Sequence, residues 1–383
     1  MNTHDPEELL RDALRAKALD AATDLTVDDI RRDAAAQRRR SLWRTAGGLA
    51  AAAAVLVGVP AALYLTSGND TPSPAPSPSI SPTVSPSSTP TGLAAIPQGK
   101  DPQVTYLHDG VVHLFGGGTA RLPAGAPTDV TEFTPYHGGW LVLDSIGGLE
   151  QYDNTGAVVK RSTRQGAVGL ALSSDQLRTV YQVDNRIENG IATGMGDTGA
   201  SMRVPAGSRL VGLVVGDGVV YNSPSGVILS SPFGASRLVP GLSTADATAS
   251  GADLVGGLAP GQKSGRVVDI TGHIQWTLSW KPAAFSPDGR YVAAVFEAAG
   301  QTADVAILDA RSGHVVSRVS LADRGLVQLG PLVWEESDSA VLFQVQDDTN
   351  HAIVRLGADG ELTRASDVEP LTRQPFWAFA TTP

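Results

Sequence analysis

The chain has 383 residues, a formal net charge of −10, 42 glycines, 25 prolines and no cysteine. The missing cysteine excludes disulfides, thiolate metal sites, a cysteine nucleophile and a lipidated N-terminal cysteine. The first 45 residues balance nine basic against nine acidic side chains, so almost all of the negative charge lies further along the chain. Because an acidic domain does not attract nucleic acid by electrostatics, we expect no nucleic-acid partner.

Residues 1–45 carry the start signals of two short helices. Asp5 and Pro6, followed by two glutamates, are typical of a helix N-terminus, and leucine and alanine then recur at helical spacing. Residues 26–29 read Thr-Val-Asp-Asp and predict the cap of a second helix. These helices could dock a cytoplasmic partner or form a solvated leader, and the sequence leaves both alternatives open.

Residues 46–66 contain no charged side chain and predict a single transmembrane helix. At the helical rise this run spans about 31 Å, which matches the hydrocarbon thickness of a bilayer. Six arginines and one aspartate lie between Arg31 and Arg44, so the positive-inside rule places the N-terminus in the cytoplasm. A cleaved signal peptide and a twin-arginine signal at Arg39-Arg40 are alternatives, but about 40 residues precede the apolar run, which favours an anchor.

Residues 67–100 predict a disordered Pro/Ser-rich stalk. Prolines at positions 72, 74, 76, 78, 82, 86 and 90 alternate with serine and threonine, a composition typical of an extended, polyproline-like spacer without a core.

Residues 101–383 predict an all-β, extracytoplasmic domain. Short β-forming runs are bounded by Gly, Asp, Asn and Pro, and no long helical period separates them. The clearest runs are residues 103–107, 140–143, 266–270, 291–296 and 340–343.

A glycine followed by an apolar strand start recurs seven times in this domain. The spacings are 46, 34, 36, 46, 41 and 47 residues, close to what one propeller blade requires. We therefore predict a β-propeller of seven blades, with six or eight as the alternatives. The seven glycines are Gly110, Gly156, Gly190, Gly226, Gly272, Gly313 and Gly360.

Residues 284–293 read Ala-Phe-Ser-Pro-Asp-Gly-Arg-Tyr-Val-Ala. This segment resembles the hairpin of bacterial WD-repeat and TolB-like β-propellers, and weaker echoes occur at residues 172–175, 333–338 and 133–135. The resemblance implies that the aromatic packs between blades and that Ser-Pro-Asp-Gly forms the turn. It covers roughly residues 102–383, although no Trp-Asp dipeptide closes a blade.

A ring needs its two ends to meet. We expect residues 104–107 to pair with a last strand near residues 376–379, so that no sheet edge remains open at the closure.

No motif indicates a reaction. Residues 194–199 match a dinucleotide-binding glycine pattern, but no helix can follow them, so a loop between strands is expected. The adjacent acids Glu335-Glu336 and Asp347-Asp348 are interpreted as solvated loop charge, and His273 and His314 as surface hairpin residues. Three arginines are candidates for lining the central channel: Arg186, Arg266 and Arg318. We therefore predict no catalytic, cofactor-binding or metal-ligating residue and no cofactor.

The layout is similar to that of single-pass membrane proteins of actinobacteria. It implies a non-catalytic binding or sensing module in the cell membrane, with the propeller outside and an extracytoplasmic protein, peptide or glycan as ligand. Some proteins of this layout resemble anti-sigma factors, so residues 1–45 could hold a sigma factor. The alternatives are an envelope polysaccharide hydrolase or lyase and a passive envelope scaffold.

Overall fold

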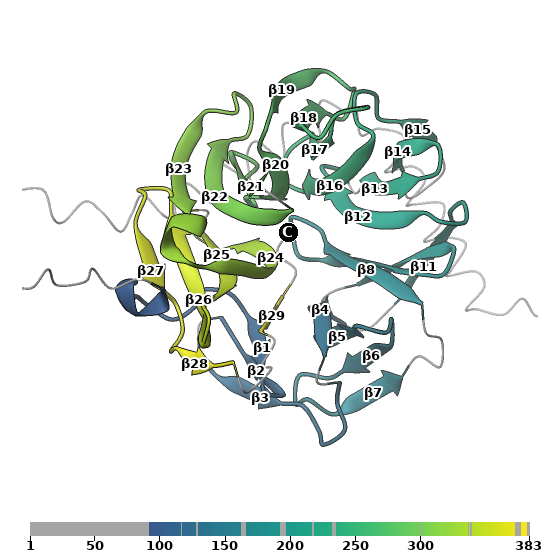
Figure 1. Cartoon of the computed structure of the whole chain (residues 1–383). Coiled ribbons are helices and arrows are strands. Elements are labelled where there is room, and N and C mark those ends of the chain that lie inside the picture. The colour runs from purple at the N-terminus through teal and green to yellow at the C-terminus, as the bar shows by residue number, and fades with distance from the viewer. Residues whose placement is uncertain are drawn as a thin grey trace, which may run out of the picture. The chain divides into compact units, whose positions relative to one another are not determined.

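The computed structural model describes residues 92–380 (Figure 1), except residues 116, 128, 162–165, 192–196, 217, 232–234, 299, 336, 338 and 372–376. The expected cytoplasmic helices, the membrane span and residues 67–91 of the stalk lie outside the described residues. Within the described part, no helix has the length and hydropathy needed to cross a bilayer. Its only helical segments are two 3₁₀ turns, η1 (Leu93–Ala95) and η2 (Ala322–Arg324).

The described strands form seven antiparallel sheets, six of which are meanders of consecutive strands (Figure 1). The first three are β4 (Val130–Tyr136), β5 (Gly139–Asp144), β6 (Leu149–Tyr152) and β7 (Val158–Arg161); β8 (Ala167–Leu172), β9 (Arg178–Val183), β10 (Arg186–Ile191) and β11 (Asp197–Arg203); and β12 (Arg209–Val214), β13 (Gly218–Ser223), β14 (Gly226–Ser230) and β15 (Ser236–Leu238).

The next two meanders are β16 (Thr244–Ala249), β17 (Leu254–Leu258), β18 (Gly265–Asp269) and β19 (Ile274–Leu278), and β20 (Lys281–Phe285), β21 (Tyr291–Ala298), β22 (Gln301–Asp309) and β23 (Val315–Ser320). The sixth is β24 (Val327–Trp334), β25 (Ala340–Gln346), β26 (Asn350–Gly357) and β27 (Leu362–Arg364), with β28 (Glu369–Pro370) added on β26.

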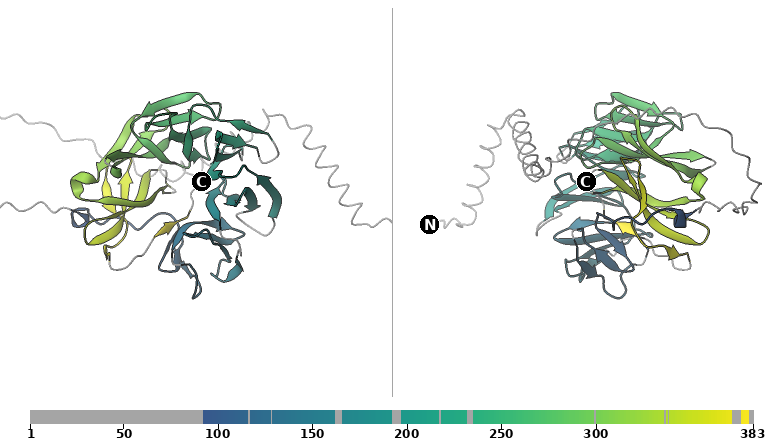
Figure 2. Two further views of the ribbon diagram at one scale, coloured as in Figure 1. Left: turned by 45° about the vertical axis from the view of Figure 1, so that its right-hand side comes forward. Right: turned by 90° about the vertical axis from the view of Figure 1, so that its left-hand side faces the viewer.

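The seventh sheet joins the two ends of the domain. Its order is β29 (Ala378–Phe379), β1 (Tyr106–His108), β2 (Val111–His113) and β3 (Thr119–Arg121). Tyr106 lies opposite Phe379 and Leu107 opposite Ala378, so the predicted closure is confirmed. The sheets surround one axis with the first strand of each innermost (Figures 1 and 2). The domain is a seven-bladed β-propeller, as predicted, and each blade is named below by its innermost strand.

The closure is reinforced by aromatic packing around Trp377, which is 3% exposed. The ring of His108 stacks on Trp377 with centroids 4.9 Å apart, and the ring of His351 lies 4.8 Å from it. Glu369 accepts a 3.1 Å contact from His108 Nε2, which ties β28 to β1. Burial lowers the pKa of His351, although the charge of Glu369 acts in the opposite direction.

The glycine repeat predicts the number of blades but does not mark one point in each blade. Gly156, Gly272, Gly313 and Gly360 have positive φ and lie in turns between third and fourth strands. Gly110 and Gly226 also have positive φ, but Gly110 lies between a second and a third strand and Gly226 is the first residue of the third strand β14. Gly190 is inside β10, so its assignment to a turn was wrong. The β9–β10 turn instead has Asp184 at φ 53°, a conformation that Asp tolerates better than most residues.

The hairpin that carries the family resemblance forms the expected turn. Ser286 Oγ donates to Asp288 Oδ1 at 2.7 Å and accepts from the Tyr291 amide at 3.0 Å, while Gly289 has φ 69°. The echo at residues 172–175 has the same bonds: Ser173 Oγ donates to Asp175 at 2.6 Å and accepts from the Arg178 amide at 2.9 Å. The resemblance therefore identified both turns correctly.

The other two echoes differ. Residues 133–135 lie inside β4, and the turn follows them at His137 and Gly138, so this echo was wrong. At residues 333–338 the turn is present, because the Glu335 amide donates to the Ala340 carbonyl as the Ser286 amide does to Tyr291. Glu335 thus stands where Ser286 stands in its own blade, and its longer side chain reaches out of the turn.

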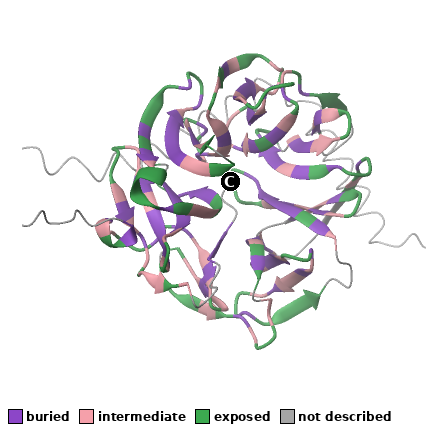
Figure 3. Ribbon diagram, viewed as in Figure 1, coloured by how far each residue is buried: buried purple, intermediate pink, exposed green. Residues whose placement is uncertain are grey.

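Blades are joined by buried side chains that bond to the backbone of a neighbour. Trp334 is fully buried and its indole N–H donates to the Ala284 carbonyl at 3.0 Å, which agrees with the expected aromatic packing between blades. Gln182 on β9 binds both Leu210 N and Ser208 O of the next blade, and Asn222 on β13 binds Ala245 in the same way. Figure 3 shows buried residues gathered on the inner strands, whereas all of β7 is exposed.

Three turns between third and fourth strands repeat one device, an aspartate that accepts several turn amides. Asp153 and Asp269 each bind the amide and the hydroxyl of the threonine two residues later, and Asp309 binds Ser312 in the same way. The threonine hydroxyl is the largest cause that lowers the pKa of Asp153. Partial burial acts to raise the pKa of Asp269 and Asp309, but the turn hydrogen bonds outweigh it and leave both pKa values low.

These turns predict loss of stability in acid. Because each folded-state pKa lies below the unfolded value of about 3.9, the stabilisation is present above that value and is lost as the pH falls through the folded pKa. We expect thermal unfolding to show a falling Tm below about pH 4, and Asp269→Asn to weaken that dependence. Asp323→Asn in η2 is the control, and an equal effect of both variants would contradict the prediction.

Candidate binding site at the channel mouth

The propeller has two ends, and the charged side chains of the innermost strands gather at one of them. In a meander the start of the first strand and the turn between the second and third strands lie at the same end of the blade. Arg209 begins β12 and Lys281 begins β20, while Glu132 and Asp246 are the third residues of β4 and β16. These four residues, from four blades, define what is called below the channel mouth.

Six of the seven innermost strands carry a bulge, and in five of them it lies within the first three residues. The pairing register shifts at β4, β8, β12, β16, β20 and β24, in each case with the second strand of the same blade. A bulge inserts an unpaired residue and re-aims its side chain, which is common beside functional sites. In the β16 blade the extra residue is Asp246, whereas Thr131, Val168, Val211 and Ala283 are the extra residues in four others.

Two of the four charges at the channel mouth already have partners. Lys281 Nζ lies 2.5 Å from Glu297 Oε2 on the adjacent strand β21. Glu132 accepts the Leu170 amide at 2.8 Å and so links the β4 and β8 blades. Because these interactions connect strands and blades, Lys281 and Glu132 have a structural role.

The other two charges, Asp246 and Arg209, have no such explanation. Among the described residues, neither side chain takes part in a hydrogen bond or an ion pair. Both side chains are exposed at the channel mouth. The charge of Arg209 nevertheless acts to lower the pKa of both Glu132 and Asp246, which places it within electrostatic reach of both. Within the part of the chain that the structure describes, Arg209 and Asp246 at the channel mouth therefore have no hydrogen-bond or ion-pair partner.

The surroundings of the two acidic side chains at the channel mouth shift their pKa values. Although water reaches the Asp246 carboxylate, the protein around it removes part of its hydration, and this desolvation raises its pKa. The charges of Lys281 and Arg209 oppose that shift, and Glu297 adds to it. Desolvation also raises the pKa of Glu132. The hydrogen bond from the Leu170 amide and the charge of Arg209 act to lower it.

A cavity of about 140 Å³ continues from Asp246 into the channel between β8, β12, β16 and β20. Strand β16 supplies its polar wall through Asp246, Thr248 and, just past the strand end, Ser250. Ser250 is 5% exposed, and its hydroxyl has no hydrogen-bond partner among the described residues. A second cavity of about 370 Å³ holds Glu132 and Arg209 between the β4, β8 and β12 strands.

The arginines predicted to line the channel lie elsewhere. Arg186 is on β10 and pairs with Glu188 at 3.1 Å, Arg266 is on β18, and Arg318 on the outermost strand β23 pairs with Asp304. None is on an innermost strand, so that prediction was wrong. Arg209 is instead the first residue of an innermost strand, and aligning the blades on their turns would have placed it at the channel mouth.

Other sequence-based candidates are placed as follows. His273 and His314 are exposed beside turn glycines, as predicted. In the glycine pattern at residues 194–199, the last three residues belong to β11, so no helix follows the pattern. Within the described residues, no group of three or more His, Cys, Asp or Glu side chains could hold a metal ion.

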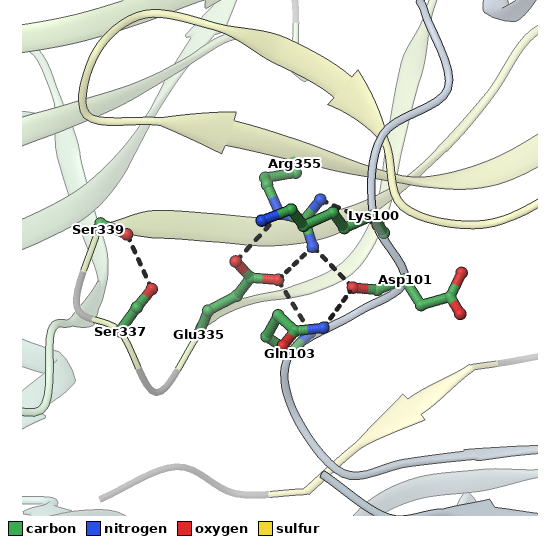
Figure 4. Close-up of polar contacts among 7 residues, drawn as sticks. All are labelled: Lys100, Asp101, Gln103, Glu335, Ser337, Ser339 and Arg355. Carbon is green, nitrogen blue, oxygen red and sulfur yellow. Dashed lines mark hydrogen bonds and ion pairs between the residues drawn. The ribbon is translucent and has the colours of Figure 1, made fainter. Parts of the chain in front are cut away.

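The expectation of solvated charge was wrong for Glu335. Its side chain is 5% exposed and receives two bonds from Arg355, at 3.0 Å from Nε and 2.6 Å from Nη2 (Figure 4). Arg355 also donates to the carbonyls of Lys100 and Asp101, and the Gln103 amide donates to Glu335 at 2.9 Å. This network lies at the end of the ring opposite the channel mouth, beside a cavity of about 730 Å³.

The Glu335–Arg355 network holds residues 92–104, which we call the N-terminal strap. Leu93 and Ile96 are buried in the core of the β24 blade, although both fall in the segment assigned to the stalk. Gly99 N and Pro97 O exchange hydrogen bonds with Arg364 at the outer edge of that blade. The packed domain therefore includes residues 92–100, which precede the expected boundary, because apolar residues of this segment complete a blade.

No protein-family model and no curated protein matches the chain. Among solved structures, TolB from Agrobacterium tumefaciens is 13% identical over 59% of this chain and 93% of its own, with a TM-score of 0.40. The Swd1 β-propeller domain of Myceliophteria thermophila is 10% identical over 69% and 91%, with a TM-score of 0.49. Dihydro-heme d1 dehydrogenase NirN is 14% identical over 75% and 78%, with a TM-score of 0.47. At these values the similarities agree with the propeller fold and carry no argument about function.

Proposed function

We propose that the chain is a non-catalytic binding module whose ligand docks at the channel mouth of the propeller. The observation that supports this most directly is a pair of opposite charges, Asp246 and Arg209, which have no partner among the described residues and line two cavities at the channel mouth. Two buried acidic side chains elsewhere in the domain are paired, Glu335 with Arg355 and Asp304 with Arg318. Charges without partners at a partly desolvated site reduce stability unless another molecule uses them.

The surroundings of the proposed site are those of a binding surface. Loops and strand starts from several blades converge there, and the rigid ring holds the side chains in fixed positions. An extracytoplasmic protein, peptide or glycan would meet both polar and apolar surface, because the exposed Val168 lies beside the Arg209 cavity.

We further propose that residues 46–66 anchor the chain in the cell membrane, with the N-terminus in the cytoplasm and the propeller outside. The uncharged run, the arginines before it and the Pro/Ser segment after it support this arrangement. In the same proposal, residues 1–45 dock a cytoplasmic regulator, for which a sigma factor is the candidate.

The binding proposal predicts ligands that depend on the channel mouth. Full-length protein in mild detergent is screened by thermal shift against peptides, sugars, cell-wall fragments and metal ions, because a ligand of the folded state raises Tm by mass action. Any ligand found is retested on Asp246→Asn and Arg209→Gln, with Glu188→Gln on β10 as the control outside the channel.

We expect the two mouth variants to reduce the shift and the control to preserve it. A ligand whose binding ignores both mouth variants would place the site elsewhere and overturn the proposal. Turnover of a polysaccharide that both variants abolish would instead favour the hydrolase alternative, for which Glu132 and Asp246 are the carboxyls with raised pKa.

A further inference from the structure

Two histidines share one carboxylate at the point where the ends of the ring join. The Nε2 atoms of His108 on β1 and His351 on β26 both face Glu369 of β28, at 3.1 Å from Oε1 and 3.9 Å from Oε2 respectively. The first distance is that of a hydrogen bond, whereas the second is too long for one. The His351 Nε2 atom is buried and has no hydrogen-bond partner among the described residues. Of the two imidazoles, only that of His108 is therefore bonded to the carboxylate.

Both imidazole rings pack on Trp377, the residue directly before the closing strand β29. The ring centroid of His108 lies 4.9 Å and that of His351 4.8 Å from the Trp377 ring. Trp377 is buried in one core cluster with Phe379, and Phe379 is one of the two residues through which β29 pairs with β1. A change of charge at His351 therefore acts on the side chain that seats the closing strand.

The groups that face His351 can compensate only one imidazolium. Glu369 on β28 is the one carboxylate in ion-pair contact with it among the described residues, and that carboxylate is already bound to His108. Asp109 is exposed and lies 4.0 Å from His108 Nε2, while Gln346, opposite His351 on β25, carries no charge. Burial is the main cause that lowers the pKa of His351, and the charge of His108 adds to it against the effect of Glu369.

We infer that His351 makes the closure of the propeller sensitive to pH, and that protonation of its buried ring loosens the attachment of Trp377 and β29. The neutral ring packs as an aromatic body in the core. Its imidazolium form would be a buried cation whose neighbouring carboxylate is engaged elsewhere, which is a costly state. Local opening of β29 removes this cost, because it exposes the ring to water. The device belongs to the fold and needs no ligand, so it does not depend on the proposed function.

Acid should therefore favour the open closure. Because the folded-state pKa of His351 is lowered, the opened form binds a proton more readily once the pH falls below the ordinary histidine value of about 6.5. The stabilisation is fully present above that value and is lost progressively below it. Uptake of one proton raises the open fraction at most about tenfold between pH 7.5 and pH 5.5. The turn aspartates act only below about pH 4, so the two effects are separable.

Hydrogen–deuterium exchange of the full-length protein in mild detergent, at pH 7.5 and pH 5.5, tests this inference. The Ala380 amide, which donates to the Thr105 carbonyl, reports opening of the closure after correction for the intrinsic pH dependence of exchange. We expect its open fraction to rise several-fold at pH 5.5, up to about tenfold. The pairing between β17 and β18 in the β16 blade is the internal reference and should keep its protection.

Variants of the three shared groups should change the response in different directions. His351→Gln cannot take up a proton and should abolish the rise in acid. Glu369→Gln removes the carboxylate that faces His351 and should enlarge the rise, whereas His108→Gln leaves Glu369 available to His351 and should reduce it. Each variant is judged by its ratio between the two pH values, because a substitution here also changes the baseline stability. The opposite effects at Glu369 and His108 keep the test decisive if His351→Gln does not fold.

His113 on β2 is the matched control near the closure. Burial lowers its pKa as well, but its ring stacks on Tyr106 and not on Trp377. His113→Gln should keep most of the response in acid, and His273→Gln, at an exposed hairpin, should keep all of it. An equal response in the parent and in His351→Gln would overturn the inference, as would its loss in His113→Gln. The same response in Glu369→Gln and His108→Gln would also overturn it, because the shared carboxylate would then have no part in the effect.

Discussion

Removing residues 374–383 is expected to abolish the cooperative unfolding of the whole propeller. The deletion removes β29, whose Phe379 and Ala378 pair with Tyr106 and Leu107, and it removes Trp377. Truncating one buried Trp or Phe typically costs about 3–5 kcal/mol, so losing two approaches the total stability of about 5–15 kcal/mol that a domain has.

The effect should spread beyond one blade because β29 contacts two neighbours. Ala380 lies beside Phe133 of the β4 blade in a parallel bridge, and its amide donates to the Thr105 carbonyl at 2.9 Å. On the other side, Gln344 of the β24 blade donates to the Trp377 carbonyl. Without β29 the edge of β1 is open, and both neighbouring blades lose part of their cover.

Differential scanning calorimetry of the truncated protein tests this prediction. The control is deletion of residues 381–383 alone, which leaves β29 and Ala380 in place and should melt like the parent. A ten-residue truncation that retains a single sharp transition near the parental Tm would show that closure is not needed for the fold. A peptide of residues 374–383 added in trans should restore part of the lost stability if the closing strand is responsible.

The sequence predicts the ring well because blades are built from local signals. Ser-Pro-Asp-Gly at residues 286–289 and the glycines with positive φ mark hairpins, and a hairpin depends only on its own residues. The spacing of the glycines then yields seven blades even though Gly190 was misplaced. An error of one turn in one blade does not alter the count, because the other turns keep the period.

The side chains at the channel mouth carry no such local motif. Whether an arginine faces the channel depends on which strand of the blade carries it and on a bulge beside it, and both are set by packing between blades. Arg186, Arg266 and Arg318 were chosen without that information, and Arg209 and Asp246 were missed. The N-terminal strap was not predicted for a related reason. Leu93 and Ile96 follow a Pro/Ser tract, and only their long-range contact with the β24 blade distinguishes them from that tract.

Breaking the buried pair between Glu335 and Arg355 is the second change with a large expected effect. Both side chains are largely buried, at 5% and 14% exposed, so removing one partner leaves the other charge without compensation. We expect Glu335→Gln and Arg355→Met each to reduce the free energy of unfolding by about 3–5 kcal/mol. The double variant should lose less than the sum of the two, because it leaves no isolated charge.

A matched control separates this effect from the general loss of a surface ion pair. Arg161 pairs with Glu150 at 3.1 Å, but its side chain is 54% exposed, so Arg161→Met should cost about 1 kcal/mol or less. Urea unfolding of the four variants measures the differences. Similar costs for Arg355→Met and Arg161→Met would mean that the buried pair contributes no more than an exposed one.

The same variants test whether the pair holds the N-terminal strap. Arg355 donates to the Lys100 and Asp101 carbonyls, and the Gln103 amide donates to Glu335, so the pair fixes the backbone on both sides of the Lys100–Asp101 bond. In the parent this bond should resist trypsin although the Lys100 side chain is exposed. In Arg355→Met it should be cut faster than in Arg161→Met under native conditions, since local opening of the strap exposes it. Faster cleavage together with an intact propeller core would show that the strap opens as a separate unit. Unchanged cleavage would mean that the burial of Leu93 and Ile96, and not the ion pair, keeps the strap in place.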